Sequence, residues 1–176
     1  MRNPWSSWRS GSTRDSRGQS MVEFAFVAPF LFLLIFGMIE AGRFVFYSEL
    51  LNSATREGAR YGIVHGSKSD CPSGPAAPGE TNGCDPSGAN VRQAVQDAAM
   101  DLASVGDLFV FDPTWTSRGS LSVPSPGDAS NGHNGRGEYV TVFVDFVYDP
   151  IIKQIMDVPL IPELTISAQS TLVVNN

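Results

Sequence analysis

The sequence "FAFVAPFLFLLIFGMI", residues 24–39, contains sixteen consecutive residues without a charge. As an α-helix it would extend about 24 Å, slightly less than the membrane hydrocarbon core of about 30 Å. Apolar residues resume in "AGRFVFY", residues 41–47, where Arg43 can pair with Glu40 and direct its guanidinium group toward the membrane surface. Together these residues predict a helix that crosses a membrane once.

The charges on the two sides of this run predict its orientation. Four arginines precede it, with Asp15 as the only acid among residues 1–18. From Phe44 to the end there are 15 acidic and 7 basic residues. Because arginines near a span stay on the cytoplasmic side, we expect a single-pass cytoplasmic membrane protein with its N-terminus inside and the remainder outside. An acidic body also excludes nucleic acid as a partner, since phosphate binding needs clustered Lys and Arg.

Two other interpretations of the apolar run remain open. A cleaved secretory signal also has a basic head, but its apolar region is usually about 7–15 residues long. Residues 37–43, "GMIEAGR", offer no convincing small-residue cleavage site because they include a glutamate and an arginine. The second alternative is a buried core helix of a soluble protein. We favour a retained membrane helix over both.

The composition divides the chain into four segments. Residues 1–18 predict a flexible, basic cytoplasmic leader. Residues 19–63 predict a transmembrane and extended helix that begins near Ser20, because apolar or small residues continue at helical spacing beyond the membrane run. Residues 64–88 are dense in Gly, Pro and Ser and predict a loop. Residues 89–176 predict an extracytoplasmic α+β domain.

The loop contains the only two cysteines, Cys71 and Cys84. Outside the cytoplasm, two thiols that flank a Pro/Gly-rich loop favour a disulfide. Free thiols remain the alternative. A metal site is disfavoured because the only histidines, His65 and His133, are not at ligand spacing.

The last segment predicts one amphipathic helix followed by antiparallel strands. The helix should occupy residues 89–106, with one apolar face and a cap from Asn90 or Ser87. That face comprises Val91, Val95, Ala98, Leu102 and Val105. Strands are expected at residues 108–116 (broken at Asp112-Pro113), 138–148 and 164–174. Residues 117–137 predict a polar loop that is either a contact surface or disordered, and the apolar residues 150–162 should cover the sheet or lie on the outer leaflet.

The sequence contains no catalytic motif that we can identify. It lacks a G-x-S-x-G elbow, a P-loop and an H-E-x-x-H pair, so we expect no enzyme activity and no cofactor. Asp145 could be a buried acid in the central strand, but a solvent-facing strand position is the simpler interpretation. The stretch "GDASNGHNG", residues 127–135, lacks the spacing and terminal Glu of a calcium loop, so we expect no metal site.

The residues before the apolar run resemble the processing site of type IV prepilins. Gly18 is followed by four residues and then by Glu23 and Phe24, at the start of the apolar span. With "LNSATREGARYG", residues 51–62, the segment resembles the TadE-like family of the tight-adherence (Flp-type) pilus system. The resemblance implies a bitopic pseudopilin or minor pilin that assists pilus assembly. It also implies that a prepilin peptidase cleaves after Gly18, that Gln19 becomes the new N-terminus, and that the body is pilin-like.

This resemblance suggests why a carboxylate lies inside the apolar run. A charge at the bilayer centre costs about 2.5–3.5 kcal/mol on insertion scales, and such residues persist where they find a partner. Cleavage after Gly18 would create an α-ammonium group four residues from Glu23, which could pair with it in the same chain or in a neighbouring pilin subunit. Alternatively, Glu23 lies at headgroup level and needs no partner.

The sequence therefore favours a structural component of a pilus, whose partners are prepilin peptidase, other pilin or pseudopilin subunits and the lipid bilayer. The main alternative is a signal-anchored binding module, unrelated to pili, that recognises a ligand through residues 117–137. A tethered hydrolase is a third possibility.

Overall fold

The computed structural model describes residues 17–99, 102–120, 124–151, 153 and 163–175. The chain forms two units, Met1–Ile39 and Glu40–Asn176, and helix α1 (Arg17–Val64) contributes to both. Of the predicted leader, the structure describes only residues 17 and 18. Most of the apolar segment 150–162 also lies outside the described residues. The predicted α+β class is confirmed by a long apolar N-terminal helix, a short helix and a small antiparallel sheet.

Helix α1 begins close to the predicted start and contains Pro29. Proline lacks the N–H of a helical hydrogen bond, a loss that membrane helices tolerate. Within the described residues, α1 is the one helix that is long and apolar enough to cross a membrane.

The sheet of the second unit is built around β3 (Tyr139–Tyr148). On one edge, β3 pairs along its whole length with β4 (Leu164–Val173). On the other edge it pairs with β1 (Asp107–Val110) and then with β2 (Thr114–Thr116). The break between β1 and β2 falls at Asp112-Pro113, as predicted, because proline cannot donate to a ladder.

Helix α2 (Ala89–Ala98) is shorter than predicted. Residues 102–105 form turns, in which the backbone N–H groups of Val105 and Gly106 donate to the carbonyl of Leu102. The predicted apolar face is partly wrong as well. Ala99 is buried in place of Ala98, which is exposed, and Val105 is 42% exposed because the helix has ended before it.

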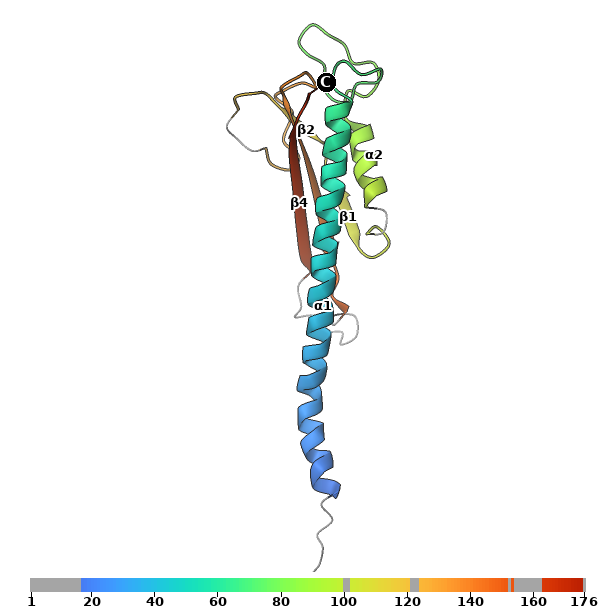
Figure 1. The fold of residues 1–176 in the computed structure, drawn as a ribbon, viewed down its shortest axis with the longest axis vertical. Helices are drawn as coiled ribbons and strands as arrows, with labels where there is room; N and C mark the ends of the chain where they lie inside the picture. The colour runs from blue at the N-terminus through green and yellow to red at the C-terminus, as the bar shows by residue number, and fades with distance from the viewer. Residues whose placement is uncertain (1–16, 100–101, 121–123, 152, 154–162, 176) are drawn as a thin grey trace, which may run out of the picture. The chain divides into compact units, whose positions relative to one another are not determined.

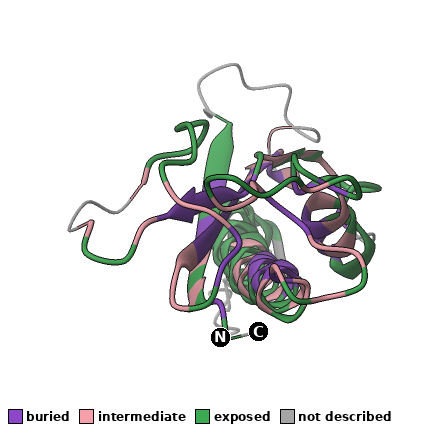
Figure 2. Cartoon of the chain, turned by 90° about the horizontal axis from the view of Figure 1, so that it is seen from above, coloured by how far each residue is buried: buried purple, intermediate pink, exposed green. Residues whose placement is uncertain are grey.

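The core of the second unit lies between the C-terminal half of α1, α2 and one face of the sheet. Figure 1 shows α2 beside this half of α1, and Figure 2 shows buried residues gathered where these elements meet. Figure 2 is coloured by burial, so the core can be followed in purple. The core is formed by these residues: Leu51, Ala54, Ala59, Val91, Val95, Trp115, Val140, Phe146 and Tyr148. Ile166 and Ala168 of β4 are buried as well.

Candidate functional site

The first turns of α1 contain the four residues of the predicted processing site. Gly18, Gln19, Glu23 and Phe24 are all exposed, and Gln19 Nε2 donates a hydrogen bond of 3.3 Å to Glu23 Oε1. A Cβ atom added to Gly18 would meet nothing within 4 Å. The described fold therefore gives no steric reason for glycine here, although glycine in a helix costs about 0.5–1 kcal/mol relative to alanine.

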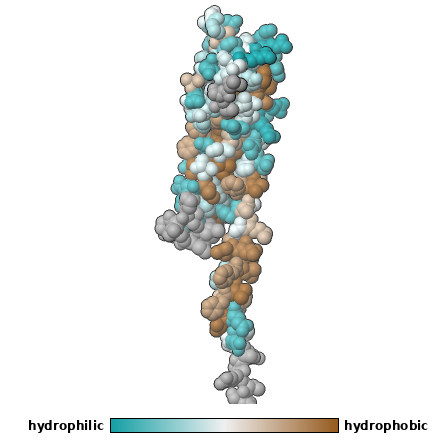
Figure 3. Space-filling view, turned by 90° about the vertical axis from the view of Figure 1, so that its left-hand side faces the viewer, coloured by the Kyte–Doolittle hydropathy of each residue, from teal (hydrophilic) through white to brown (hydrophobic). Residues whose placement is uncertain are grey.

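The next part of α1 presents an uncovered apolar surface. Its large apolar side chains, including Phe30 and Leu33, are exposed, and Figure 3 shows them as a nearly continuous brown surface. Burying one such side chain is worth about 1.5–3 kcal/mol. A surface this extensive needs an apolar environment that the chain itself does not supply in the described residues.

A polar cluster lies in the second unit where α1 meets the end of β3. Glu40 Oε1 accepts hydrogen bonds from the hydroxyl of Tyr148 and from the backbone N–H of Ile151, the latter at 3.2 Å. Arg43 Nη1 lies 3.6 Å from Glu40 Oε2, and Arg43 Nη2 donates a 3.2 Å hydrogen bond to the hydroxyl of Tyr47. The predicted Glu40–Arg43 pair is thus present, and two tyrosines and a backbone amide complete it.

Aromatic rings shield this cluster from water. The guanidinium carbon of Arg43 lies 5.1 Å from the ring centre of Tyr148 and 5.6 Å from that of Tyr47, within range of a cation–π interaction. Burial, and then the hydrogen bond to the Glu40 carboxylate, raise the pKa of Tyr148. The phenol therefore stays protonated and remains a donor to Glu40.

The helix that contains both features matches a known family. Residues 18–60 match the family model described as TadE-like protein. This segment is TadE-like. No curated protein and no solved structure matches the chain. The resemblance drawn from the sequence is thereby confirmed, and it indicates a component associated with the Tad pilus.

The two parts of the TadE-like segment have different surroundings. Residues 18–39 are exposed almost throughout, whereas residues 40–60 place one face in the core. Gly58, in the TadE-like stretch "REGARYG", lies so close to Val95 of α2 that an added Cβ atom would clash with that side chain. This glycine therefore lets α2 approach α1 closely, a packing role that its position in the sequence did not reveal.

The disulfide loop is held by its own polar residues. Cys71 and Cys84 are joined by a disulfide with Cα atoms 5.4 Å apart. Asn82 Nδ2 donates to the carbonyls of Pro72 and Gly74 at 3.0 and 2.7 Å. These bonds tie the two ends of the loop together beside the disulfide.

Asp85, rather than the predicted Asn90 or Ser87, caps α2. Its carboxylate accepts hydrogen bonds from the backbone N–H groups of Ala89 (2.8 Å) and Asn90 (3.0 Å). Burial alone would raise the pKa of Asp85, but hydrogen bonds to the carboxylate, led by these two, lower it overall. The sequence did not predict this role, because an ordinary N-cap residue lies immediately before the helix, whereas Pro86, Ser87 and Gly88 separate Asp85 from α2.

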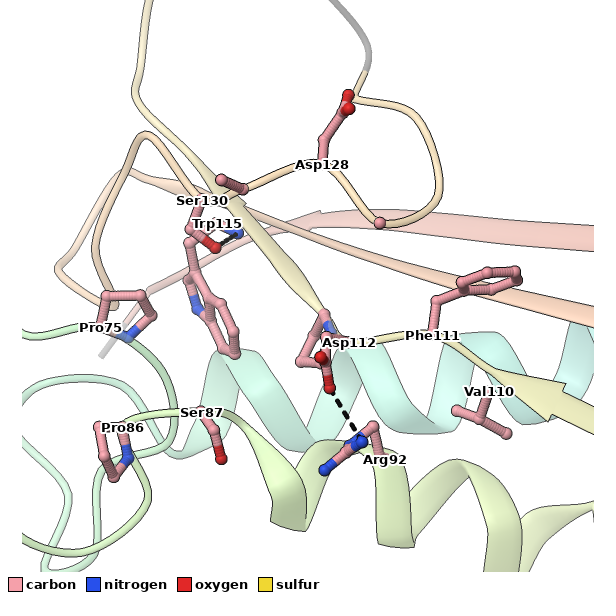
Figure 4. Close-up of a pocket in the computed structure, with 13 residues that line it drawn as sticks. Pro75, Pro86, Ser87, Arg92, Val110, Phe111, Asp112, Trp115, Asp128 and Ser130 are labelled. Carbon is pink, nitrogen blue, oxygen red and sulfur yellow. Dashed lines mark hydrogen bonds and ion pairs between the residues drawn. The ribbon is translucent and has the colours of Figure 1, made fainter.

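The disulfide loop also encloses Trp115 of β2. An added Cβ atom at Gly74 or Gly88 would clash with the indole, and both glycines have positive φ angles, of 98° and 74°. Beside this tryptophan lies a cavity of about 530 Å³ (Figure 4). Its walls come from the disulfide loop, α2, the β1–β2 connection and residues 127–130, so part of the predicted loop 117–137 takes part in it.

The remaining sequence predictions concern metals and acids. Asp145 is half-buried in β3, so it is neither fully solvent-facing nor a buried acid. In the described ranges, no group of three or more His, Cys, Asp or Glu side chains could hold a metal ion. The two histidines have other neighbours. His133 Nε2 lies 4.0 Å from Glu138 Oε1, and the ring of His65 stacks on that of Tyr61 with the ring centroids 3.9 Å apart.

Proposed function

We propose that this protein is a pseudopilin or minor pilin of a tight-adherence, type IV-like pilus, processed by a prepilin peptidase after Gly18. One observation carries the proposal: the TadE-like segment combines an exposed apolar helix, residues 18–39, with a helical part that anchors an α+β body. The exposed part suits a bilayer or neighbouring helices. The body stays outside the cytoplasm and performs no turnover chemistry.

The geometry around Gly18 supports cleavage at this position. The described fold leaves open space around Gly18, and a residue without a side chain lets a peptidase approach the backbone closely. After cleavage, the α-ammonium group of Gln19 gives Glu23 a cationic partner, where the uncleaved helix offers the neutral side-chain amide of Gln19. In an assembly, pairing of Glu23 with the Gln19 of a neighbour sets the axial register of the helices.

Intact mass and N-terminal sequencing of the protein from its host's membranes test the processing step. We expect a chain that begins at Gln19, with or without cyclisation to pyroglutamate. Gly18→Ala should retain residues 1–18. The control is Gly42→Ala, because Gly42 is also a helical glycine with nothing within 4 Å of an added Cβ atom, and it should be processed normally. A wild-type chain that retains residues 1–18 would contradict the proposal.

Substitution of Glu23 separates the proposed function from the anchored binding module. Glu23→Ala should abolish incorporation into pili while leaving the protein in the membrane and its body folded. Incorporation is measured by the amount of this chain in sheared pilus fractions, with membrane fractions as the reference. Normal incorporation of Glu23→Ala would contradict the register role, and absence of the wild-type chain from sheared pili would favour the anchored module.

A further inference from the structure

The cavity beside Trp115 is built as a small-molecule site. Its volume of about 530 Å³ falls within the range of roughly 300–1,000 Å³ that is usual for ligand pockets. Apolar walls come from Val110, Phe111 and prolines, and polar side chains from separate segments of the chain line the same cavity (Figure 4). These polar residues are Ser87, Arg92, Asp112, Asp128 and Ser130.

The hydrogen-bonding groups of this cavity are only partly used by the protein. Arg92 Nη1 is 2.9 Å from Asp112 Oδ1, a pair in which both side chains remain accessible. The hydroxyl oxygen of Ser130 accepts a 3.0 Å hydrogen bond from the backbone N–H of Trp115, which leaves its own O–H free to donate. The lining thus offers donors and acceptors at short range from each other.

Trp115 adds a buried donor without a partner. The residue is 1% exposed, and within the described part of the chain its Nε1 has no hydrogen-bond acceptor. In Figure 4 the indole nitrogen is on the ring edge turned toward Pro75, which also lines the cavity. A buried donor left unpaired costs about 1–3 kcal/mol, so an acceptor delivered here, by a ligand or by water that it orders, would be favourable.

The charges decide between ligand classes. Among the described residues that line the cavity, the one guanidinium is that of Arg92, and its pairing with Asp112 disfavours phosphate, sulfate and carboxylate ligands. A purely apolar ligand would leave these ionised groups desolvated without partners. A hydroxyl group both donates and accepts, so a ring with several hydroxyls matches the mixed lining, and its C–H faces match the apolar walls.

We propose that this cavity binds a neutral saccharide, with Arg92, Asp112 and Ser130 bonding its hydroxyl groups. The site belongs to the second unit and does not depend on the pilus role of the TadE-like helix. The affinity expected for one sugar ring is weak, because few polar contacts are available to offset the cost of binding. Display of many copies on a surface would raise the effective affinity.

A glycan array probed with the full chain in detergent micelles tests the proposal. We expect binding to neutral glycans, and loss of at least tenfold in affinity for Asp112→Asn. The matched control is Asp97→Asn, on the exposed side of α2 and outside this cavity, which should bind normally. Both changes remove one carboxylate from exposed positions, so the fold should tolerate them equally.

A second readout follows Trp115 itself. The other tryptophans, Trp5 and Trp8, are in the leader, so Trp5→Phe with Trp8→Phe leaves Trp115 as the only indole fluorophore. Titration with the free monosaccharide that ends the best-bound glycan should shift its emission, and Asp112→Asn should suppress the shift. An array without neutral glycan binding, binding confined to sialylated or sulfated glycans, or equal binding by Asp112→Asn would each overturn the proposal.

Discussion

Tyr148→Phe should destabilise the body by removing one hydrogen bond to the half-buried carboxylate of Glu40. The hydroxyl of Tyr148 donates to Glu40, and the tyrosine is fully buried. Hydrogen bonds to charged groups contribute about 1.5–3 kcal/mol. Because Glu40 keeps the amide of Ile151 and the ion pair with Arg43, we expect the lower part of this range, about 1.5–2 kcal/mol. For a chain of this size that corresponds to a fall in Tm of about 3–8 °C.

The measurement is thermal unfolding of the full chain in detergent micelles, followed by near-ultraviolet circular dichroism. The control is Tyr139→Phe on the same strand, whose hydroxyl makes no hydrogen bond within the described residues. A double-mutant cycle with Glu40→Gln isolates the pair, and its coupling energy should exceed about 1 kcal/mol. If Tyr148→Phe and Tyr139→Phe unfold at the same temperature, or the coupling is zero, the cluster does not stabilise the fold as argued.

Three further changes test the packing of the second unit. Gly58→Ala should lower the free energy of unfolding by about 1–3 kcal/mol in denaturant titrations because the methyl group clashes with α2, whereas Gly42→Ala should not. Replacing Cys71 and Cys84 by serine should cost on the order of 3 kcal/mol in the same titration, and an unchanged midpoint would show that the disulfide contributes nothing. The lowered pKa of Asp85 contributes stability that is present above its unfolded value of 3.8 and is lost as pH falls through the folded value. The stability difference between wild type and Asp85→Asn should therefore shrink below about pH 4, and a constant difference would contradict this assignment.

The long helix and the strands could be predicted because their patterns are local. The length of the uncharged run 24–39 predicts a helix, and the alternation in β4 predicts a strand. Both signals can be read from consecutive residues alone. The end of α2 could not be predicted in this way. Ala98 and Ala99 are both helix formers, so their residue types do not mark the end of the helix, and the burial of Ala99 and Leu102 in the core is a tertiary feature.

The candidate sites likewise divide into one that a local sequence pattern predicts and others that depend on tertiary packing. The prepilin-like pattern from Gly18 to Phe24 is contiguous and was recognised from sequence alone. The partners of Glu40 and the residues that enclose Trp115 come from segments far apart in the chain. No spacing rule links Glu40 to Tyr148, or Gly74 to Trp115, because the packing of α1 and of the disulfide loop against the strands brings them together.

The position of Glu40 has a mechanical consequence. It is the first residue of the second unit, so any tension applied along the N-terminal part of α1 enters the body there. Its carboxylate bonds both to the side chain of Tyr148 at the end of β3 and to the backbone of Ile151. We therefore expect a load that reaches Glu40 to pass into the central strand through Tyr148 as well as along the helix.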